Sequence, residues 1–592
     1  MNLGFNKKTG LAIVVIGLLG IFISLLVTAS FAAKFILSDH HITPLGVERL
    51  QTYRILLAAF GTFLVLIGTI IIFIPIKKIL TLFNNMVLSK KIFLLLIVGS
   101  FLFVTGTISQ NVNNPDLWYD EAGQFWISQG LNHYSAPLQN PAGIASIIEN
   151  NAIHNLDPGG FSILLRLWSQ ISSAYPWLRL LPLLFLIGTI SLFIYLSYKW
   201  TGSFSSALLV GFIPLLFSNV VFMGSEVRAY SMEYFGVILG VAAIYSIQKK
   251  LSYGNLFLWG VVLSLFLTSR YSIIITTFSC SLYIIYLIVR SNLGNWNKFK
   301  SIFIYALPIL ITLTCIYLFT LRIQNPEIIQ LFYLPYLIDY WKLLIYPSNH
   351  LIYMISILSL FVILIYALKN KNSTLQKYLP VLFVAVSSNI IFILISFLGK
   401  YPWVPLDKRG LPYFILTLLC GTALIGEILS RLMNLTNKLV YLSVGLNILL
   451  LLFIQQDILT QRSKSTDMMS CVQGVHFSDY EKIYVDRWAS PSIRYYFEYG
   501  NLQHLQPGIY PDKFTFAAVP NRDSYSSYKN SKNPLQDYYA TQPEMNDLVQ
   551  YDLLITPELK RFGNSDLWMP NPGCESAGII YIKKELHNMG GE

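Results

Sequence analysis

Long apolar runs separated by short polar stretches recur from residue 11 to residue 456. A helix that crosses a membrane needs roughly 20 consecutive, mostly apolar residues, and most of these runs have about that length. They therefore predict about 13 transmembrane helices, near residues 11–33, 54–76, 92–109, 178–198, 205–223, 230–247, 255–269, 272–289, 301–321, 351–368, 378–398, 411–430 and 438–456. The shorter run 161–175 contains Arg166 and predicts an interfacial or half-inserted helix.

The pattern changes beyond about residue 458, where Asp, Asn, Ser and Tyr become frequent. Two short apolar runs, Lys482–Val485 and Leu553–Ile555, are typical of strands. Between them, Ser490–Glu498 predicts a helix, because it has Ser at the cap and Pro at the first helical position. We therefore expect two domains: an all-α transmembrane domain over residues 1–457 and a small α/β domain over residues 458–592.

The composition agrees with a membrane protein. The chain is 54% hydrophobic and 12% charged, with a mean hydropathy of +0.55, whereas soluble domains carry about 25% charged residues. The net charge of +12 does not indicate nucleic-acid binding, because Lys and Arg are scattered among short loops instead of forming a stripe. The apolar run from Leu11 is too long for a cleavable signal peptide, so we expect it to remain as the first span.

The connections between the predicted helices alternate in charge. One set contains Lys and Arg with no Asp or Glu between them, and the positive-inside rule predicts that it is cytoplasmic. Its basic residues are Lys7, Lys8, Lys77, Lys78, Lys90, Lys91, Lys199, Lys249, Lys250, Arg290, Lys298, Lys300, Lys369, Lys371, Lys377, Arg431 and Lys438. With an odd number of spans in the plasma (inner) membrane, the N-terminus is cytoplasmic and the C-terminal domain is extracytoplasmic. Cys471 and Cys574 can then form a disulfide, which the sequence leaves open.

The opposite set of connections mixes acids and bases, as a site for a charged substrate requires. The outer loop 110–177 contributes Asp120, Glu121, His154 and Asp157. Later outer connections contribute Glu226, Arg228, Tyr230, Arg270, Lys408 and Arg409. Cations on this side run against the positive-inside bias. Because Arg suits phosphate oxygens, a lipid-linked phosphate is the ligand that we expect.

Each of these features also has a simpler interpretation. Asp120 and Glu121 can be ordinary interfacial charges, or Asp120 can be a general base that removes a proton from an acceptor hydroxyl. The flanking Trp118 and Tyr119 can belong to an aromatic belt at the membrane interface or stack on a sugar. A divalent metal held by the acids and His154 is a further alternative, although no tight ligand spacing supports it.

The order of these motifs resembles a known group of enzymes. The motifs are Asp120-Glu121-Ala122, His154 and Asp157-Pro158 before Phe161-x-x-x-x-Arg166-Leu167-Trp168, Leu178-Arg179-Leu180-Leu181-Pro182, Glu226-x-Arg228-x-Tyr230, and Lys408-Arg409-Gly410-x-Pro412-Tyr413. Over about residues 92–430 they resemble the bacterial and archaeal GT-C glycosyltransferases, the group of the dolichyl-phosphate-mannose protein mannosyltransferases and lipid A aminoarabinose transferases. The chain departs from that group in having two predicted spans before the span that leads into the acidic loop.

The resemblance implies a GT-C-like fold, a polyprenyl-phosphate-linked sugar as donor, an extracytoplasmic glycan, lipid or protein as acceptor, and inversion at the anomeric carbon. It implies that Asp120 is the catalytic base and that Glu121 positions Asp120 or the acceptor. A phosphate leaving group needs only cations to hold its developing charge. The candidate phosphate-binding residues are Arg228, Arg270, Lys408 and Arg409, and the candidate residues of the substrate loops are His154, Asp157, Glu226 and Tyr230.

Two other classes of membrane protein remain open. A transporter or flippase generally keeps ionisable residues deep inside its spans, whereas Glu233 and Glu427 lie near predicted helix ends. The sequence also has no pair of interrupted helices that would indicate inverted repeats. An O-antigen ligase or polymerase is the other alternative. The sequence indicates no definite cofactor and leaves a divalent metal open.

Overall fold

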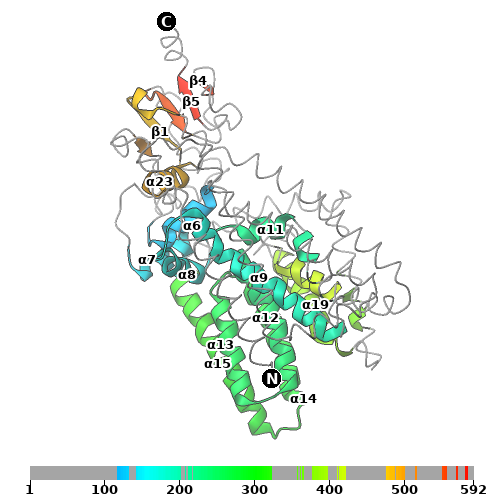
Figure 1. Cartoon of the computed structure of the whole chain (residues 1–592). Helices are drawn as coiled ribbons and strands as arrows, with labels where there is room; N and C mark the ends of the chain where they lie inside the picture. The colour runs from blue at the N-terminus through cyan, green and yellow to red at the C-terminus, as the bar shows by residue number, and fades with distance from the viewer. Residues whose placement is uncertain are drawn as a thin grey trace, which may run out of the picture. The chain divides into compact units, whose positions relative to one another are not determined.

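A computed structural model of the chain describes part of its length (Figure 1). The described residues are 117–131, 142–155, 157–201, 207, 211, 213–216, 218–322, 357, 360–361, 363–365, 376–397, 410, 412–421, 472, 475–486, 489–499, 514–516, 550–555, 568–570 and 580–583. The chain divides into two compact units, residues 1–113 with 430–455 and residues 114–429 with 456–592. All described residues belong to the second unit.

Four of the described helices are long and apolar enough to cross a membrane. They are α9 (Tyr175–Thr201), α12 (Tyr230–Lys249), α14 (Ile273–Arg290) and α15 (Asn295–Ile316), which continues through the π-helical turn η3 (Tyr317–Leu321). Large apolar side chains of α15, such as Phe303 and Leu310, are more than half exposed. Lipid suits such a surface and water does not. The chain is therefore a helical membrane protein.

The predicted spans 178–198, 230–247, 272–289 and 301–321 are confirmed by these four helices. Two other predicted spans correspond to shorter apolar helices. Helix α13 (Tyr253–Leu267) has 15 residues. In α19 (Leu379–Phe397), the apolar helix covers Leu379–Ile395.

The expected span at 205–223 is interrupted by the 3₁₀ turn η2 (Ile213–Leu216) before α11 (Ser218–Ser225). Pro214 lies in that turn, and its missing backbone N–H and fixed φ disfavour a continuous helix. The predicted spans 11–33, 54–76, 92–109 and 438–456 lie outside the described residues, and 351–368 and 411–430 are described only in part.

Basic residues mark one end of these helices. Lys199, Lys249 and Arg290 lie in the last turns of α9, α12 and α14. Near this end, Lys377 Nζ donates a hydrogen bond to the Trp200 carbonyl (2.6 Å), and the rings of Trp200 and Tyr245 are in contact. The opposite end, where α9, α12 and α14 begin and α13 ends, lies beside α6 and α8 (Figure 1). Among the described residues, these basic side chains and the mixed acid–base residues of the predicted outer connections therefore lie at opposite ends of the helices.

Short helices cover the end opposite to these basic residues. They are α6 (Tyr119–Ser128), α7 (Ile144–Asn150), the π-helical turn η1 (Asn151–Asn155) and α8 (Gly160–Ser169). The run expected to be interfacial thus contains a helix of ten residues, too short to span a bilayer. Trp168 and Trp177 join α8 to α9. Their rings stack at 4.5 Å, and each indole N–H donates to the other residue's carbonyl, at 2.7 and 2.9 Å.

The C-terminal part contains a five-stranded sheet with the order β2-β1-β3-β5-β4. Its strands are β1 (Ile483–Val485), β2 (Phe514–Phe516), β3 (Leu553–Ile555), β4 (Trp568–Pro570) and β5 (Ile580–Lys583). β1 is parallel to β2 and β3, whereas β5 is antiparallel to β3 and β4. Helix α23 (Ser490–Tyr499) follows β1. The strands and the helix predicted near residues 482–485, 553–555 and 490–498 are confirmed.

The sheet and α6 share one hydrophobic core. Ile483 and Val485 of β1 and Ile493 of α23 belong to the same buried cluster as Phe125 and Trp126 of α6. Because side chains alternate along a strand, Tyr484 points to the other face, where it packs with Leu554 and Trp568. The C-terminal part is thus packed directly against the helix that carries Asp120 and Glu121.

Candidate functional site

Seven of the residues that the sequence singles out surround the beginnings of α6, α9 and α12 and the connection between α13 and α14. Their positions follow from helix ends: Asp120 and Glu121 lie in the first turn of α6, and Arg228 precedes α12. Arg270 lies between α13 and α14. The structure also brings Asp157, Glu226 and Tyr230 into this group, as the contacts of the two arginines show.

Asp120 is the more accessible of the two adjacent acids. Its side chain is 15% exposed, and its Oδ1 lies 3.5 Å from Arg228 Nη1. The same nitrogen donates a hydrogen bond to the Asp120 carbonyl (3.4 Å). A carboxylate in the first turn of a helix is also favoured by the helix dipole. Asp120 is therefore held beside a cation and still reaches the surface.

Glu121 is completely buried and fully engaged. Arg179 forms a two-pronged ion pair with it, with Nη2 at 2.6 Å from Oε2 and Nε at 2.9 Å from Oε1. The Val227 amide donates to the same Oε1 at 3.0 Å. This carboxylate thus joins α6 to α9 and to the segment before α12. The sequence motif that contains Arg179 does not reveal this pairing. The available signal is its charge at the start of an apolar helix, because buried charges in spans are rare without a role.

The ring of Tyr230 lies within cation–π distance of both arginines. The guanidinium carbons of Arg270 and Arg228 are 4.6 and 5.6 Å from the ring centroid, inside the range of about 6 Å for such contacts. Burial lowers the pKa of Arg228, but its neighbours together raise that pKa by more than burial lowers it. The pKa of Arg228 therefore lies above its usual range. The neighbours are Tyr230, Asp120, Asp157 and Glu226. Arg228 is therefore a permanent cation.

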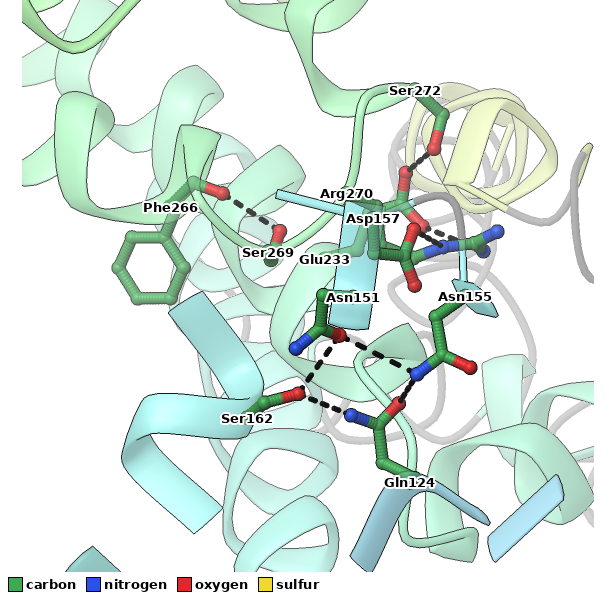
Figure 2. A network of polar contacts seen from close by, with 10 residues as sticks. All are labelled: Gln124, Asn151, Asn155, Asp157, Ser162, Glu233, Phe266, Ser269, Arg270 and Ser272. Carbon is green, nitrogen blue, oxygen red and sulfur yellow. Dashed lines mark hydrogen bonds and ion pairs between the residues drawn. The ribbon is translucent and has the colours of Figure 1, made fainter. Parts of the chain in front are cut away.

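Arg270 is held by two carboxylates from different elements (Figure 2). Its Nε lies 3.4 Å from Asp157 Oδ1, and its Nη1 lies 3.4 Å from Glu233 Oε2. Ser272 Oγ in turn donates to Glu233 Oε1. Glu233, in the first turn of α12, is completely buried. Glu233 belongs to no recognised sequence motif, although an acid at the start of a span is itself a signal.

The glycine pair after Asp157 permits this arrangement. Gly159 has φ +94°, a backbone conformation that side chains disfavour. The Gly160 amide donates to the Thr268 carbonyl at 2.9 Å. A Cβ on Gly160 would lie 2.0 Å from Thr268 Oγ1 and 2.7 Å from the Thr268 carbonyl oxygen. The close approach brings the Asp157 loop beside the chain that leads to Arg270.

A neutral network of side chains lies next to this cluster (Figure 2). Gln124, one turn beyond Asp120, accepts from Asn155 Nδ2 at 2.9 Å and donates to Ser162 Oγ. Ser162 Oγ donates to Asn151 Oδ1 at 2.9 Å. These residues bind α6 to η1 and α8. Sequence reasoning missed them, because Asn, Gln and Ser in a loop carry no motif.

Some candidate residues fall outside this description. Lys408 and Arg409 lie outside the described residues, as does the side chain of His154. Within the described part of the chain, no group of three or more His, Cys, Asp or Glu side chains has an arrangement that could hold a metal ion. Glu121, one of the expected ligands, is bound to Arg179. The described geometry thus gives the metal alternative no support.

The described cluster contains more acids than bases. Four carboxylates, those of Asp120, Asp157, Glu226 and Glu233, surround the two guanidiniums of Arg228 and Arg270. Buried charges of this kind need partners. The arrangement offers one partly exposed carboxylate beside fixed cations, which suits proton removal next to a bound anion.

Comparison with known proteins gives no family for the chain: no family model, no curated protein and no solved structure matches it.

Proposed function

We propose that the chain is an integral membrane glycosyltransferase of the GT-C type, which transfers a sugar from a polyprenyl-phosphate-linked donor to an extracytoplasmic glycan, lipid or protein. One observation carries the proposal. The partly exposed Asp120 carboxylate lies 3.5 Å from the buried cation Arg228, at the end of apolar helices opposite to their basic ends.

In the proposed reaction, Asp120 accepts the proton of an acceptor hydroxyl. The hydroxyl oxygen forms a bond to the anomeric carbon of the donor sugar, on the face opposite to the phosphate. The bond between that carbon and the phosphate oxygen breaks, and polyprenyl phosphate leaves with the electron pair. The configuration at the anomeric carbon is inverted. General-base catalysis of this kind contributes about 10²- to 10⁴-fold to a rate.

Arg228 and Arg270 are the proposed partners of the donor phosphate. Preorganised cations stabilise charge that develops on a leaving group without reorganising during the reaction. The permanent charge of Arg228 supports this role. Because four carboxylates already surround these two cations, a phosphate needs further positive charge. Lys408 and Arg409 are the proposed source, and Gly410, the next residue, is buried.

Glu121 has a positioning role in this proposal. Both of its oxygens are bound by Arg179 or by the Val227 amide, so it fixes the first turn of α6 instead of accepting a proton. Asp120 then presents its carboxylate from a turn that cannot rotate without breaking the pair.

The test uses membranes that contain the full-length protein and a radiolabelled polyprenyl-phosphate sugar. We expect Asp120→Asn to lower transfer to acceptors by about 10²-fold or more. Glu149→Gln, an exposed acid on α7 outside the cluster, is the matched control and should retain transfer. Unchanged transfer by Asp120→Asn would remove this residue as the base. Movement of lipid or solute by the wild type without any sugar transfer would overturn the enzyme proposal.

A further inference from the structure

We infer that helix α23 of the C-terminal part positions the proposed base, through the hydroxyls of two adjacent tyrosines, Tyr495 and Tyr496. Each hydroxyl binds the carbonyl of a segment that leads into a helix of the site. The catalytic consequence rests on the proposed function, whereas the contact itself does not.

Tyr496 holds the chain where it enters α6. Its hydroxyl donates to the Leu117 carbonyl at 3.4 Å, three residues before Asp120. The residue at the cap of α6, Trp118, makes no side-chain capping hydrogen bond. Both Leu117 and Tyr496 are buried, so water does not replace this contact. The bond therefore restrains the segment that sets the direction of the first turn.

Tyr495 holds the chain where it enters α9. Its hydroxyl donates to the Ser173 carbonyl at 2.6 Å, two residues before α9 begins and six before Arg179. Burial raises the pKa of Tyr495 well above its usual value, so the hydroxyl keeps its proton and remains a donor. Through Arg179, this segment is connected to Glu121 in the same turn as Asp120.

Further contacts of α23 hold the middle of α6. Trp126 Nε1 donates to the Pro491 carbonyl at 2.9 Å, and the Arg494 guanidinium lies 3.9 Å from the Trp126 ring centroid. The Phe125 ring meets the Tyr495 ring edge to face at 5.4 Å. A helix of ten residues is too short to be stable by itself. It depends on such packing for its position.

The two tyrosines thus restrain the two chain segments that lead to Glu121 and Arg179. Loss of either hydroxyl lets one entry segment shift relative to the other, and Asp120 moves with its turn. A displacement of about 1 Å at a reacting group can lower a rate by about 100-fold. Arg270 is held by Asp157 and Glu233, which lie outside α6, so its part in binding the donor phosphate should change little.

The experiment compares Tyr495→Phe, Tyr496→Phe and the double variant with the wild type, all full length and in lipid nanodiscs. Hydrogen exchange of the peptide covering residues 117–131 is measured by mass spectrometry, together with kcat and the donor KM. We expect faster exchange across this peptide and a fall in kcat of about 10-fold or more in the double variant, with the donor KM changed less than twofold.

Tyr484→Phe is the control, because its ring packs on the other face of the sheet; it should alter neither readout. Peptides of β1 and β3 report whether each variant is folded. Unchanged exchange at residues 117–131 in a folded double variant would overturn the inference. A rise in donor KM equal to the loss in kcat/KM would overturn the positioning role. Faster exchange, together with a wild type that transfers no sugar, would leave the contact intact and refute the proposed function.

Discussion

Two adjacent carboxylates have opposite environments in this protein. The Asp120 side chain is 15% exposed and meets one guanidinium at 3.5 Å, whereas Glu121 is completely buried in a two-pronged pair with Arg179. The sequence could place both acids at the outer end of a span. It could not tell them apart, because the difference arises from Arg179, 58 residues further along the chain.

Removal of Glu121 should therefore affect folding more than removal of the Asp120 charge. Glu121→Ala leaves the Arg179 guanidinium buried without a carboxylate, which typically costs about 3–5 kcal/mol. We expect a clearly lower thermal unfolding midpoint for Glu121→Ala and a nearly unchanged midpoint for Asp120→Asn. A double variant, Glu121→Leu with Arg179→Met, should recover part of the loss. Equal midpoints for Glu121→Ala and the wild type would contradict a stabilising pair.

Gly160 should not tolerate even one added methyl group. A Cβ there would lie 2.7 Å from the backbone oxygen of Thr268, so α8 or the chain leading to Arg270 must move. We expect Gly160→Ala to weaken donor binding by about 10-fold, a loss of about 1.4 kcal/mol, because the Asp157–Arg270 contact shifts. Gly143→Ala, where the added atom meets nothing within 4 Å, is the control. The measurement that checks this prediction is the donor KM of both variants.

At the scale of elements, apolar length alone was enough to predict α9, α12, α14 and α15. It failed at 205–223, where Pro214 lies in a 3₁₀ turn, since a hydropathy window does not register a missing amide N–H. The contacts between distant residues at the site could not be predicted from the sequence for another reason. Thr268 and Gly160 meet only because α8 begins beside the end of α13, a helix distant in sequence, and no local pattern contains that information.

The contact between α8 and α9 makes a separate prediction. Each indole N–H of Trp168 and Trp177 donates to the other residue's carbonyl, and a hydrogen bond of this kind contributes about 0.5–1.5 kcal/mol. Trp168→Phe keeps an aromatic ring and removes one of the two bonds. We expect a lower thermal midpoint for Trp168→Phe and no change for Trp296→Phe, whose ring is 66% exposed on α15. Equal effects of the two changes would argue against a specific joint.

At the scale of the molecule, the C-terminal sheet packs against α6, a helix of the predicted outer loop. Val485 and Ile493 share a core with Phe125 and Trp126, and residues 456–592 fall in one compact unit with residues 114–429. Short apolar runs in the sequence predicted two of the sheet's five strands, β1 and β3. The sequence could not predict that they pack on α6, because the bond from Trp126 to Pro491 joins residues 365 positions apart.

The same packing makes the orientation in the membrane testable with two probes. Asn292, beside the basic end of α14, and Ser478, in the C-terminal part, are both exposed. In a variant without its native cysteines, an impermeant thiol reagent should label Ser478→Cys on intact cells. It should label Asn292→Cys only after permeabilisation, because basic helix ends stay in the cytoplasm. Since α6 and the sheet share a core, the result for Ser478 also locates Asp120. Labelling of Asn292→Cys on intact cells, with Ser478→Cys protected, would place the proposed base in the cytoplasm and exclude an extracytoplasmic acceptor.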